Sequence, residues 1–358
     1  MVWLLKILFF LVKLRRQNFF YHQPQVIAMN FYLQLTRRLL FFALIMFLFF
    51  SCSKNSTNRN GATSDVTVFS NIQYGSNKDV SGNTIPLLLD VYIPVHIDQA
   101  KKLPLMLFVH GGGFVAGDKV DAASFMKTFA LAGFAAVSIN YRLDSSVEGS
   151  SNPCETDTNL TIKGLYMAVQ DVKAALRFMV ANASEYNIDA SKIFLSGNSA
   201  GAITVLNTQF LTQAEFNELI PGVEAELGGI DNSGNTLTTT YQVSGIAANS
   251  GCLGKPAYIT SSNAVPVIFF HGGQDDVIPV NQGHTYNCPN TMYVYGSSSL
   301  YVRMQEIGAP SVIHILPTGS HGPYNESFLQ ENETCFFNSI INDQPENGAY
   351  SGYASSCP

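Results

Sequence analysis

Apolar runs typical of strands alternate with stretches of helical period along most of the chain. Leu105–Val109 and Phe134–Ile139 are continuous apolar runs, which is the pattern of strands buried on both faces of a sheet. Leu160–Ala183 instead has apolar residues at helical spacing, at positions 162, 165, 169, 172, 176 and 179. Strands that alternate with helices predict crossover connections and a mostly parallel sheet.

The same apolar patterns predict the remaining strands and helices. We expect further strands at Val66–Ile72, Leu87–Ile93, Ile193–Leu195, Val243–Ala247, Val265–Phe270 and Val312–Leu316. Further helices are expected at Ala122–Ala132, at Phe210–Leu219, within Gln282–Ile307 and at Glu326–Ile341. The first two strands precede any crossover and should form an antiparallel edge. The predicted fold is one α/β domain over residues 65–343, with helices on both faces of the sheet and an irregular tail over 344–358.

The pattern of the N-terminal residues is different. Arg37 and Arg38 precede an unbroken apolar run of twelve residues, Leu39–Phe50. This length fits the apolar core of a signal segment and is short of the roughly 20 residues that a membrane-spanning helix needs. The run ends at Ser51-Cys52, as in a bacterial lipoprotein signal, so we expect Cys52 to be lipidated. A simple secretory signal and an uncleaved anchor remain alternatives.

Residues 1–52 are therefore expected to be a targeting segment, and the Ser/Asn/Thr-rich residues 53–64 a flexible tether. Within the first segment, a start at Met29 would leave an ordinary signal, so residues 1–28 are interpreted as an over-extended reading frame. We expect the protein to be exported, as an outer-membrane or cell-surface lipoprotein or in the periplasm. Contact with a membrane is expected only through the lipid anchor.

The charge of the chain excludes one class of partner. Only 13% of the residues are charged, the formal net charge is −6, and no Lys/Arg-rich stretch occurs after residue 60. Because phosphate binding needs clustered cations, we expect no nucleic acid partner. The apolar share of 46% is enough for a sizeable buried core.

After Cys52 the chain has five further cysteines, at 154, 252, 288, 335 and 357. None has the spacing of a zinc site, so no metal is expected. Export favours pairing of thiols, but five cannot all pair with one another. Cys252 and Cys288 each follow a strand that should end near the active face of the sheet. The sequence does not establish a pairing, and a 252–288 disulfide is the one that we expect.

Candidate chemistry begins with Gly197–Gly201, which matches the G-x-S-x-G pattern of a nucleophile elbow. The strand 192–195 precedes it and an apolar stretch, 202–206, follows as a helix. Such a turn would hold the Ser199 hydroxyl clear of the sheet edge as a nucleophile. The N–H of Ala200, at a helix N-terminus, would face a developing oxyanion. The alternative is a structural Gly/Ser turn.

A glycine loop follows another buried strand, at His110–Phe114. Glycines let the backbone approach a ligand closely, so Gly112 and Gly113 are predicted to complete an oxyanion hole with Ala200. A nucleotide-binding loop is excluded, because the G-x-G-x-x-G spacing and the acidic residue that follows it are absent. A structural glycine turn is the remaining alternative.

The base and the acid follow by elimination, since this kind of elbow precedes first an acid and then a histidine. His321 lies in a loop beyond the last strand, whereas His314 lies inside that strand and His284 falls in a helix too early in the chain. Asp275 follows the strand 265–270 at the better offset for the acid. Its neighbour Asp276 is the fallback, and Asp231 lies in a polar loop.

These segments together resemble α/β-hydrolases of the carboxylesterase and hormone-sensitive-lipase type. The chain is most similar to exported bacterial esterases that include feruloyl/acetyl-xylan esterases. The matching segments are Leu89–Pro94, His110–Lys119, Asn140–Leu143, Gly197–Gly201 and His271–Pro279. Asn198 departs from the usual Asp or Glu of the elbow and leaves the subfamily open. The segments 144–158 and 221–240 have no family pattern and should shape the substrate pocket.

The resemblance implies a serine carboxylic-ester hydrolase that works through an acyl-enzyme, with Ser199, Asp275 and His321 as its triad. No metal or organic cofactor is needed for this chemistry. The expected partner is a small-molecule or polymer-attached ester, from the environment or from plant polysaccharide. Two alternatives stay open: an amidase or peptidase of the same fold, and a surface binding module that has lost catalysis.

Overall fold

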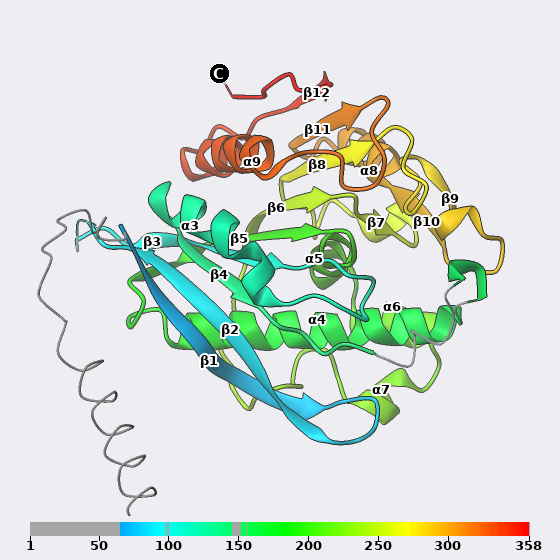
Figure 1. Cartoon of the computed structure of the whole chain (residues 1–358), viewed down its shortest axis with the longest axis horizontal. Coiled ribbons are helices and arrows are strands. Elements are labelled where there is room, and N and C mark those ends of the chain that lie inside the picture. Colours follow the sequence, from blue (N-terminus) through cyan, green and yellow to red (C-terminus); the bar gives the residue numbers. More distant parts are fainter. Residues whose placement is uncertain (1–64, 97, 99, 145–151, 156, 358) are drawn as a thin grey trace, which may run out of the picture. The chain divides into compact units, whose positions relative to one another are not determined.

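A nine-stranded sheet forms the centre of the protein (Figure 1). The computed structural model describes residues 65–357 apart from 97, 99, 145–151 and 156. The strand order is β1-β2-β4-β3-β5-β6-β8-β11-β12. The bounds are β1 Val66–Lys78, β2 Thr84–Pro94, β3 Leu103–Val109, β4 Ala135–Ile139, β5 Ile188–Asn198, β6 Val243–Asn249, β8 Val267–Gly272, β11 Ser311–Leu316 and β12 Gly348–Ser351.

The sheet is antiparallel at one edge and parallel elsewhere. Strand β2 runs antiparallel to both β1 and β4. Every pairing from β4 through β3, β5, β6, β8 and β11 to β12 is parallel. Parallel strands end at the same edge, so the loops after β3, β5, β8 and β11 can meet there. The predicted mostly parallel sheet with an antiparallel edge is confirmed.

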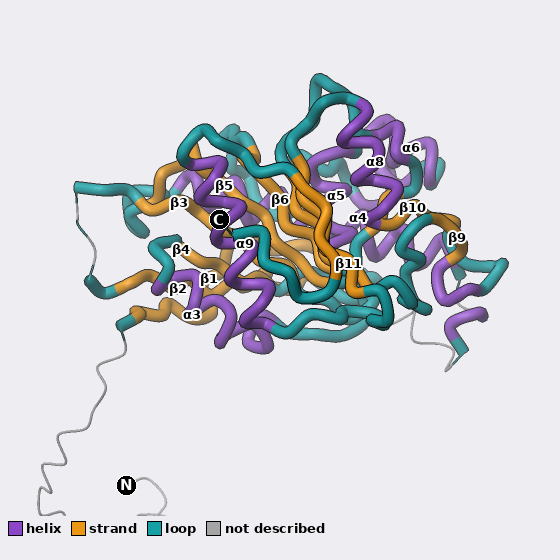
Figure 2. The backbone as a smooth tube through the Cα atoms, turned by 90° about the horizontal axis from the view of Figure 1, so that it is seen from above, coloured by secondary structure: helices purple, strands orange, loops and turns teal. Residues whose placement is uncertain are grey.

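Helices cover both faces of this sheet, because alternate residues of each strand point to opposite sides. On β3, Met106 belongs to an apolar cluster with α3 (Ala123–Leu131) and α9 (Glu326–Ile341). Its neighbours Leu105 and Leu107 instead join a cluster with α4 (Thr158–Ala181), α5 (Ala200–Phe210) and α8 (Ser297–Glu306). Figure 2 shows these two helical layers with the strands between them.

The remaining elements are short. Strands β7 (Cys252–Leu253), β9 (Gln282–His284) and β10 (Tyr293–Gly296) form a small antiparallel sheet, in the order β7-β10-β9. The other helices are α6 Gln213–Leu219 and α7 Val223–Leu227, and the 3-10 turns are η2 Lys119–Ala122, η4 Pro153–Glu155, η5 Pro256–Tyr258 and η6 Thr285–Asn287. The helix predicted within 282–307 begins only at Ser297, so the prediction that His284 lies in a helix is wrong.

The predicted disulfide between Cys252 and Cys288 is also wrong. Cys288 is bonded to Cys154, with the two Cα atoms 5.2 Å apart. A second disulfide joins Cys335 to Cys357, at 5.6 Å. Cys252 is a free thiol, because it starts β7 inside the apolar core, and Cys288 lies beside the η4 turn that contains Cys154. Both Cα separations lie in the usual range for disulfides.

The C-terminal tail is more ordered than its composition indicates. Residues 344–358 are expected to be irregular, but Gly348–Ser351 form β12 and pair with β11. The disulfide of Cys357 to α9 ties the chain down beyond that strand. The irregular-tail prediction is therefore wrong for these four residues.

Residues 1–64 lie outside the described residues. The targeting segment, the over-extended start, the tether and lipidation at Cys52 therefore stay predictions, as do the domain boundaries. Among the residues that the structure describes, no helix is both long and apolar enough to span a membrane.

Candidate active site

Ser199 stands on a sharp turn between β5 and α5. Its φ of 54° and ψ of −121° lie in a strained region for a residue with a side chain. The neighbouring glycines make the turn possible. A Cβ on Gly197 would lie 2.5 Å from the carbonyl carbon of Gly201, and a Cβ on Gly201 would lie 1.9 Å from the Val109 carbonyl oxygen. The Ser199 N–H donates to the Asn249 carbonyl at 2.8 Å, which fixes the turn against β6.

The three residues predicted as a triad meet at this turn. His321 Nε2 lies 2.7 Å from Ser199 Oγ, and His321 Nδ1 lies 2.8 Å from Asp275 Oδ2. Asp275 follows β8 and His321 follows β11, so the loops at one edge of the sheet supply both. Asp276, the fallback for the acid, is exposed. The structure thus brings together one hydroxyl, one imidazole and one carboxylate in hydrogen-bonding sequence.

The Asp275 carboxylate is held ionised by its donors. Burial by itself would raise the pKa of this group, but hydrogen bonds from His271, His321 and the Ile278 N–H lower the pKa well below its usual range. Oδ1 accepts the N–H groups of Val277 and Ile278 at 2.9 and 2.8 Å. Because the carboxylate is ionised, Nδ1 of His321 carries the proton, and Nε2 is free to accept one from Ser199.

A second histidine, His271, contacts the Asp275 carboxylate. His271 is fully buried on β8, with Nε2 3.3 Å from Asp275 Oδ2 and 3.0 Å from the Ile278 carbonyl. Its Nδ1 lies 2.7 Å from the Ser297 hydroxyl. In the sequence, His271 stands out only as the first residue of the family segment His271–Pro279. Its position four residues before the acid, at the end of a buried strand, is the signal that was available.

The loop that carries His321 is fixed by its own backbone. The Gly322 N–H donates to Ser250 Oγ at 3.0 Å, and the Gln274 N–H donates to the Gly319 carbonyl at 2.9 Å. The first bond ties the base loop to the end of β6, and the second ties it to the acid loop. His321 therefore reaches Ser199 from a loop that is anchored on both sides.

The predicted oxyanion loop lies beside the elbow. A Cβ on Gly111 would lie 3.3 Å from Ser199 Cβ, so this loop passes close to Ser199 and leaves no room there for a larger residue. Gly112 and Gly113 have φ values of 110° and 63°, and a Cβ on Gly112 would lie 2.0 Å from the Ala116 carbonyl oxygen. Ala200 is the first residue of α5, so its N–H has no intrahelical partner.

The carbonyl of Gly112 fixes the orientation of one peptide in this loop. It accepts the N–H groups of Val115 and Ala116 at 3.0 and 3.1 Å. In a planar trans peptide the C=O and the next N–H point in opposite directions. The N–H of Gly113 is therefore turned away from these two donors, out of the loop's interior.

The other histidines considered for the base lie elsewhere. His314 is buried in β11, stacked between Phe270 and Tyr350, and burial lowers its pKa to about 4. His284 is in β9, with Nδ1 2.7 Å from the Thr291 carbonyl. Neither is bonded to the elbow, so the choice of His321 agrees with the geometry. Within the described part of the chain, no cluster of three His, Cys, Asp or Glu residues could hold a metal ion.

A cavity of about 410 Å³ adjoins the elbow on the side of α3 and α9. It is lined by Phe108, His110, Gly111, Gly112, Gly117, Asp121, Ala122, Phe125, Gly197, Asn198, Asn249, Gly322, Tyr324, Glu326, Leu329 and Glu333. This lining includes the oxyanion loop and the residues next to Ser199 and His321. On the opposite side of the sheet, a smaller and more apolar cavity of about 160 Å³ includes Leu165, Ile203 and Leu253.

Several side chains in the wall of the larger cavity are polar. His110 Nε2, Asn198 Oδ1 and Asn249 Oδ1 are buried atoms to which no group of the described residues is hydrogen-bonded. Glu333 also lines the cavity, and burial raises its pKa to about 8 although Ser196 Oγ donates to it at 2.8 Å. Among the described residues, no lysine or arginine lines the cavity. Because asparagine and histidine side chains can both donate and accept hydrogen bonds, this polar wall suits a ligand with hydroxyl groups.

Part of the chain is similar to known protein families. Residues 89–252 match the family described as BD-FAE. The chain is 31% identical over 171 residues to a medium-chain fatty acyl-CoA hydrolase precursor of Anas platyrhynchos, covering 46% of this chain and 28% of that protein. It is 29% identical over 180 residues to fumonisin B1 esterase of Sphingopyxis macrogoltabida, covering 48% of this chain and 33% of that one. The chain thus spans about a third or less of these relatives.

Solved structures agree on the fold. A truncated form of a carbohydrate esterase from gut microbiota superposes with a TM-score of 0.53 at 23% identity, covering 78% of this chain and 99% of that chain. Esterase B from Lactobacillus Rhamnosis gives a TM-score of 0.50 at 16% identity, covering 78% and 87%. At such identities the likeness concerns the fold alone. Together with the sequence matches, it confirms the predicted resemblance to esterases of the α/β-hydrolase fold.

Proposed function

We propose that this α/β-hydrolase, with its BD-FAE segment at 89–252, is a serine carboxylic-ester hydrolase that works through an acyl-enzyme. One observation carries the proposal. The His321 imidazole lies 2.7 Å from the Ser199 hydroxyl and 2.8 Å from the Asp275 carboxylate, beside a glycine loop that passes close to Ser199. This arrangement activates a hydroxyl for attack on a carbonyl carbon.

Acylation is the first half of the reaction. Ser199 Oγ attacks the ester carbonyl carbon while its proton passes to His321 Nε2. The carbonyl oxygen becomes an oxyanion, which the N–H groups of Gly112, Gly113 and Ala200 stabilise. His321 then gives its proton to the alcohol oxygen as the ester C–O bond breaks. The alcohol leaves, and the acyl group stays on Ser199.

Deacylation repeats these steps with water. His321 Nε2 takes a proton from a water molecule, whose oxygen attacks the acyl carbon. The oxyanion forms again at the same N–H groups, and the proton returns to Ser199 Oγ as the acid leaves. Throughout, the ionised Asp275 stabilises the imidazolium that forms at each step.

The test of this proposal is Ser199→Ala. We expect hydrolysis of p-nitrophenyl acetate to fall by about 10⁶ in kcat, because the acyl-enzyme cannot form. Ser191→Ala is the matched control, since Ser191 is an exposed serine on the same strand, β5, and its hydroxyl donates to nearby Asp189 at 2.6 Å. It should retain full activity. Undiminished hydrolysis by the Ser199 variant would contradict the proposal.

We further propose that the substrate is an acyl ester of a polyhydroxylated alcohol, such as a plant polysaccharide. The polar side chains of His110, Asn198 and Asn249 in the wall of the 410 Å³ cavity support this, because sugar hydroxyls can exchange hydrogen bonds with them. The fold likeness to a carbohydrate esterase is consistent with it.

An acetylated xylo-oligosaccharide and an acetate ester of an aliphatic alcohol distinguish the substrate classes. The oligosaccharide ester should have the higher kcat/KM, and Asn249→Leu should reduce that preference by removing one polar side chain from the cavity wall. Equal kcat/KM for both esters would reject the polysaccharide proposal, while leaving ester hydrolysis itself intact. Feruloyl and longer-chain esters of the same oligosaccharide then define the acyl preference.

Export is proposed as well, with Cys52 as the lipidation site. The disulfides Cys154–Cys288 and Cys335–Cys357 support it, because structural disulfides persist mainly in oxidising compartments. Metabolic labelling with a fatty-acid analogue should label the wild-type chain and not Cys52→Ala. An unlabelled wild-type chain in the culture medium would favour a simple secretory signal. N-terminal peptide mapping would detect residues 1–28 if they are translated.

A further inference from the structure

We propose that Tyr141 is a positioning residue for the oxyanion loop, whose hydroxyl orients the peptide that presents the Gly112 N–H. The inference rests on the proposed ester hydrolysis, in which that N–H stabilises the oxyanion. Tyr141 lies in the loop after β4 and is about 30 residues away in sequence from the glycines that it contacts.

The hydroxyl of Tyr141 lies against two carbonyl groups of the loop. It donates toward the His110 carbonyl at 3.2 Å and the Gly111 carbonyl at 3.3 Å. The Tyr141 ring stacks on the His110 imidazole, with the ring centroids 4.4 Å apart. Burial raises the pKa of the hydroxyl, so it keeps its proton and remains a donor.

His110 supplies a second donor to the same place. Its Nδ1 lies 2.7 Å from the Gly111 carbonyl oxygen. Burial lowers the pKa of His110, so the ring is neutral, and facing a carbonyl requires that Nδ1 carry its single proton. The Gly111 carbonyl is thus held by an imidazole N–H and a phenol O–H.

Peptide planarity transmits this restraint to the site. The Gly111 carbonyl and the Gly112 N–H belong to one trans peptide and point in opposite directions. Two donors on the carbonyl side therefore fix the direction of the N–H on the other side. Glycine at 111 and 112 leaves the adjoining φ and ψ angles soft, so the orientation depends on such external bonds.

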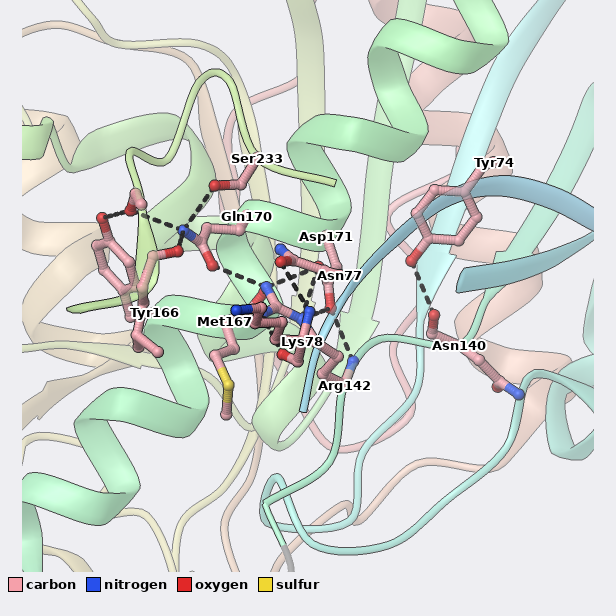
Figure 3. Close-up of polar contacts among 12 residues, drawn as sticks. Tyr74, Asn77, Lys78, Asn140, Arg142, Tyr166, Met167, Gln170, Asp171 and Ser233 are labelled. Atoms are coloured by element: carbon pink, nitrogen blue, oxygen red, sulfur yellow. Dashed lines mark hydrogen bonds and ion pairs between the residues drawn. The ribbon is translucent and has the colours of Figure 1, made fainter. Parts of the chain in front are cut away.

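Tyr141 itself is held by the residues on both sides of it. The Asn140 carbonyl accepts the Tyr74 hydroxyl at 2.8 Å. The Arg142 N–H donates to Asp171 Oδ2 at 2.8 Å, and its guanidinium is bonded to Asp171 and Gln170 on α4 (Figure 3). This buried ion pair sits at the loop end of β4 and links the main helix to the tyrosine. The hydroxyl of Tyr141 therefore has little freedom to leave the carbonyls.

The test is Tyr141→Phe, which removes only the hydroxyl. We expect kcat for p-nitrophenyl acetate to fall roughly tenfold with KM unchanged, since an oxyanion depends more on the Gly112 N–H than a neutral carbonyl does. The Ki of a trifluoromethyl ketone, which forms an oxyanion adduct on the serine, should rise by a similar factor. Rates are normalised to the active fraction by fluorophosphonate titration, so partial misfolding does not mimic the effect.

Tyr166→Phe is the matched control. Tyr166 is also fully buried, and its hydroxyl donates to the Gly228 carbonyl at 2.6 Å, away from the glycine loop (Figure 3). It should lose stability without a change in kcat or Ki per active site. If Tyr141→Phe does not fold, His110→Phe removes the other donor and should raise Ki in the same way.

A Tyr141→Phe enzyme with unchanged kcat and Ki per active site would overturn the inference. So would equal increases in KM and Ki, because they would indicate a general loss of binding. Either result would leave ester hydrolysis in place, since that proposal fails only if the wild-type enzyme is inactive or Ser199→Ala is active.

Discussion

Two buried carboxyl groups near the elbow have opposite pKa shifts. Asp275, after β8, accepts bonds from His321, from His271 and from two backbone N–H groups, which lower its pKa despite burial. Glu333, on α9, accepts one hydroxyl, that of Ser196, and burial raises its pKa to about 8. Burial alone therefore does not decide the charge of a carboxyl group here. The number of donors decides it.

The difference in pKa gives the two carboxyl groups different chemical roles. An ionised carboxylate can hold an imidazole in one tautomer and stabilise its cation, which the proposed mechanism requires of Asp275. A neutral carboxylic acid in a cavity wall cannot do so, but it can exchange hydrogen bonds with a hydroxyl-bearing ligand. We therefore expect the isosteric amide to reduce kcat at position 275 and to change mainly the pH dependence of stability at position 333.

The largest expected effect is that of Asp275→Asn. The amide oxygen would stay with the Val277 and Ile278 N–H groups, so the amide NH2 would face His321 Nδ1 and favour the wrong tautomer. A neutral amide also cannot stabilise the imidazolium, so kcat should fall by about 10⁴ while KM changes little. Steady-state kinetics with p-nitrophenyl acetate measure this. The matching Glu333→Gln enzyme should stay within about threefold of wild-type kcat, since the cost of one altered hydrogen bond is small. Similar losses of kcat in both variants would contradict the different roles of the two carboxyl groups.

A smaller effect is expected from His271→Phe. This change removes one of the donors to Asp275 but leaves His321 in place, so kcat should fall only roughly tenfold. The pKa of Asp275 should rise toward its ordinary value. A group with a depressed pKa stabilises the fold above its unfolded-state pKa and loses that contribution on acidification. The Tm deficit of the variant should therefore be greatest near neutral pH and shrink in acid.

Glu333→Gln should show itself in stability instead of rate. Folding raises the pKa of Glu333, so its contribution is complete at low pH and is lost as the pH rises through about 8. Glutamine carries no such pH-dependent penalty. The Tm of Glu333→Gln relative to wild type should increase between about pH 5 and about pH 9. A Tm difference independent of pH would mean that Glu333 is ionised in the folded protein at neutral pH.

The smallest effect belongs to Ser196→Ala. The hydroxyl of Ser196 lowers the pKa of Glu333, so its removal should raise that pKa further. The loss of stability with rising pH should then continue to a higher pH than in wild type. Thermal melts of Ser196→Ala, with and without Glu333→Gln, over a range of pH show whether this change in the pH dependence of Tm comes from Glu333. A shift that persists in the double variant would assign it to another group.

The sequence predicts the sheet well, and it also predicts which three side chains meet at the Ser199 turn. Continuous apolar runs such as Leu105–Val109 mark strands buried on both faces, and that burial recurs in the structure. Ser199, Asp275 and His321 could be chosen because each follows a strand of the parallel sheet, and such strands end at one edge. For these three residues, the residue type and its position after a strand are enough to select it from the sequence.

Other features depend on contacts that no local pattern encodes. Cys288 pairs with Cys154 across 134 residues, because a turn far away in sequence reaches it. Strand β12 has no apolar run and forms because β11 offers a free edge and Cys357 is tied to α9. Tyr141 reads in the sequence as one residue of a family segment. Only the fold places its hydroxyl on the glycine loop.

The central claim is that Ser199 alone becomes acylated. A fluorophosphonate probe followed by intact-mass and peptide analysis tests it most directly. We predict one adduct per chain, on the peptide that contains Ser199, with hydrolysis of p-nitrophenyl acetate lost in proportion to labelling. An enzyme that hydrolyses the ester while Ser199 stays unlabelled, or whose label lies on another residue, would contradict the account.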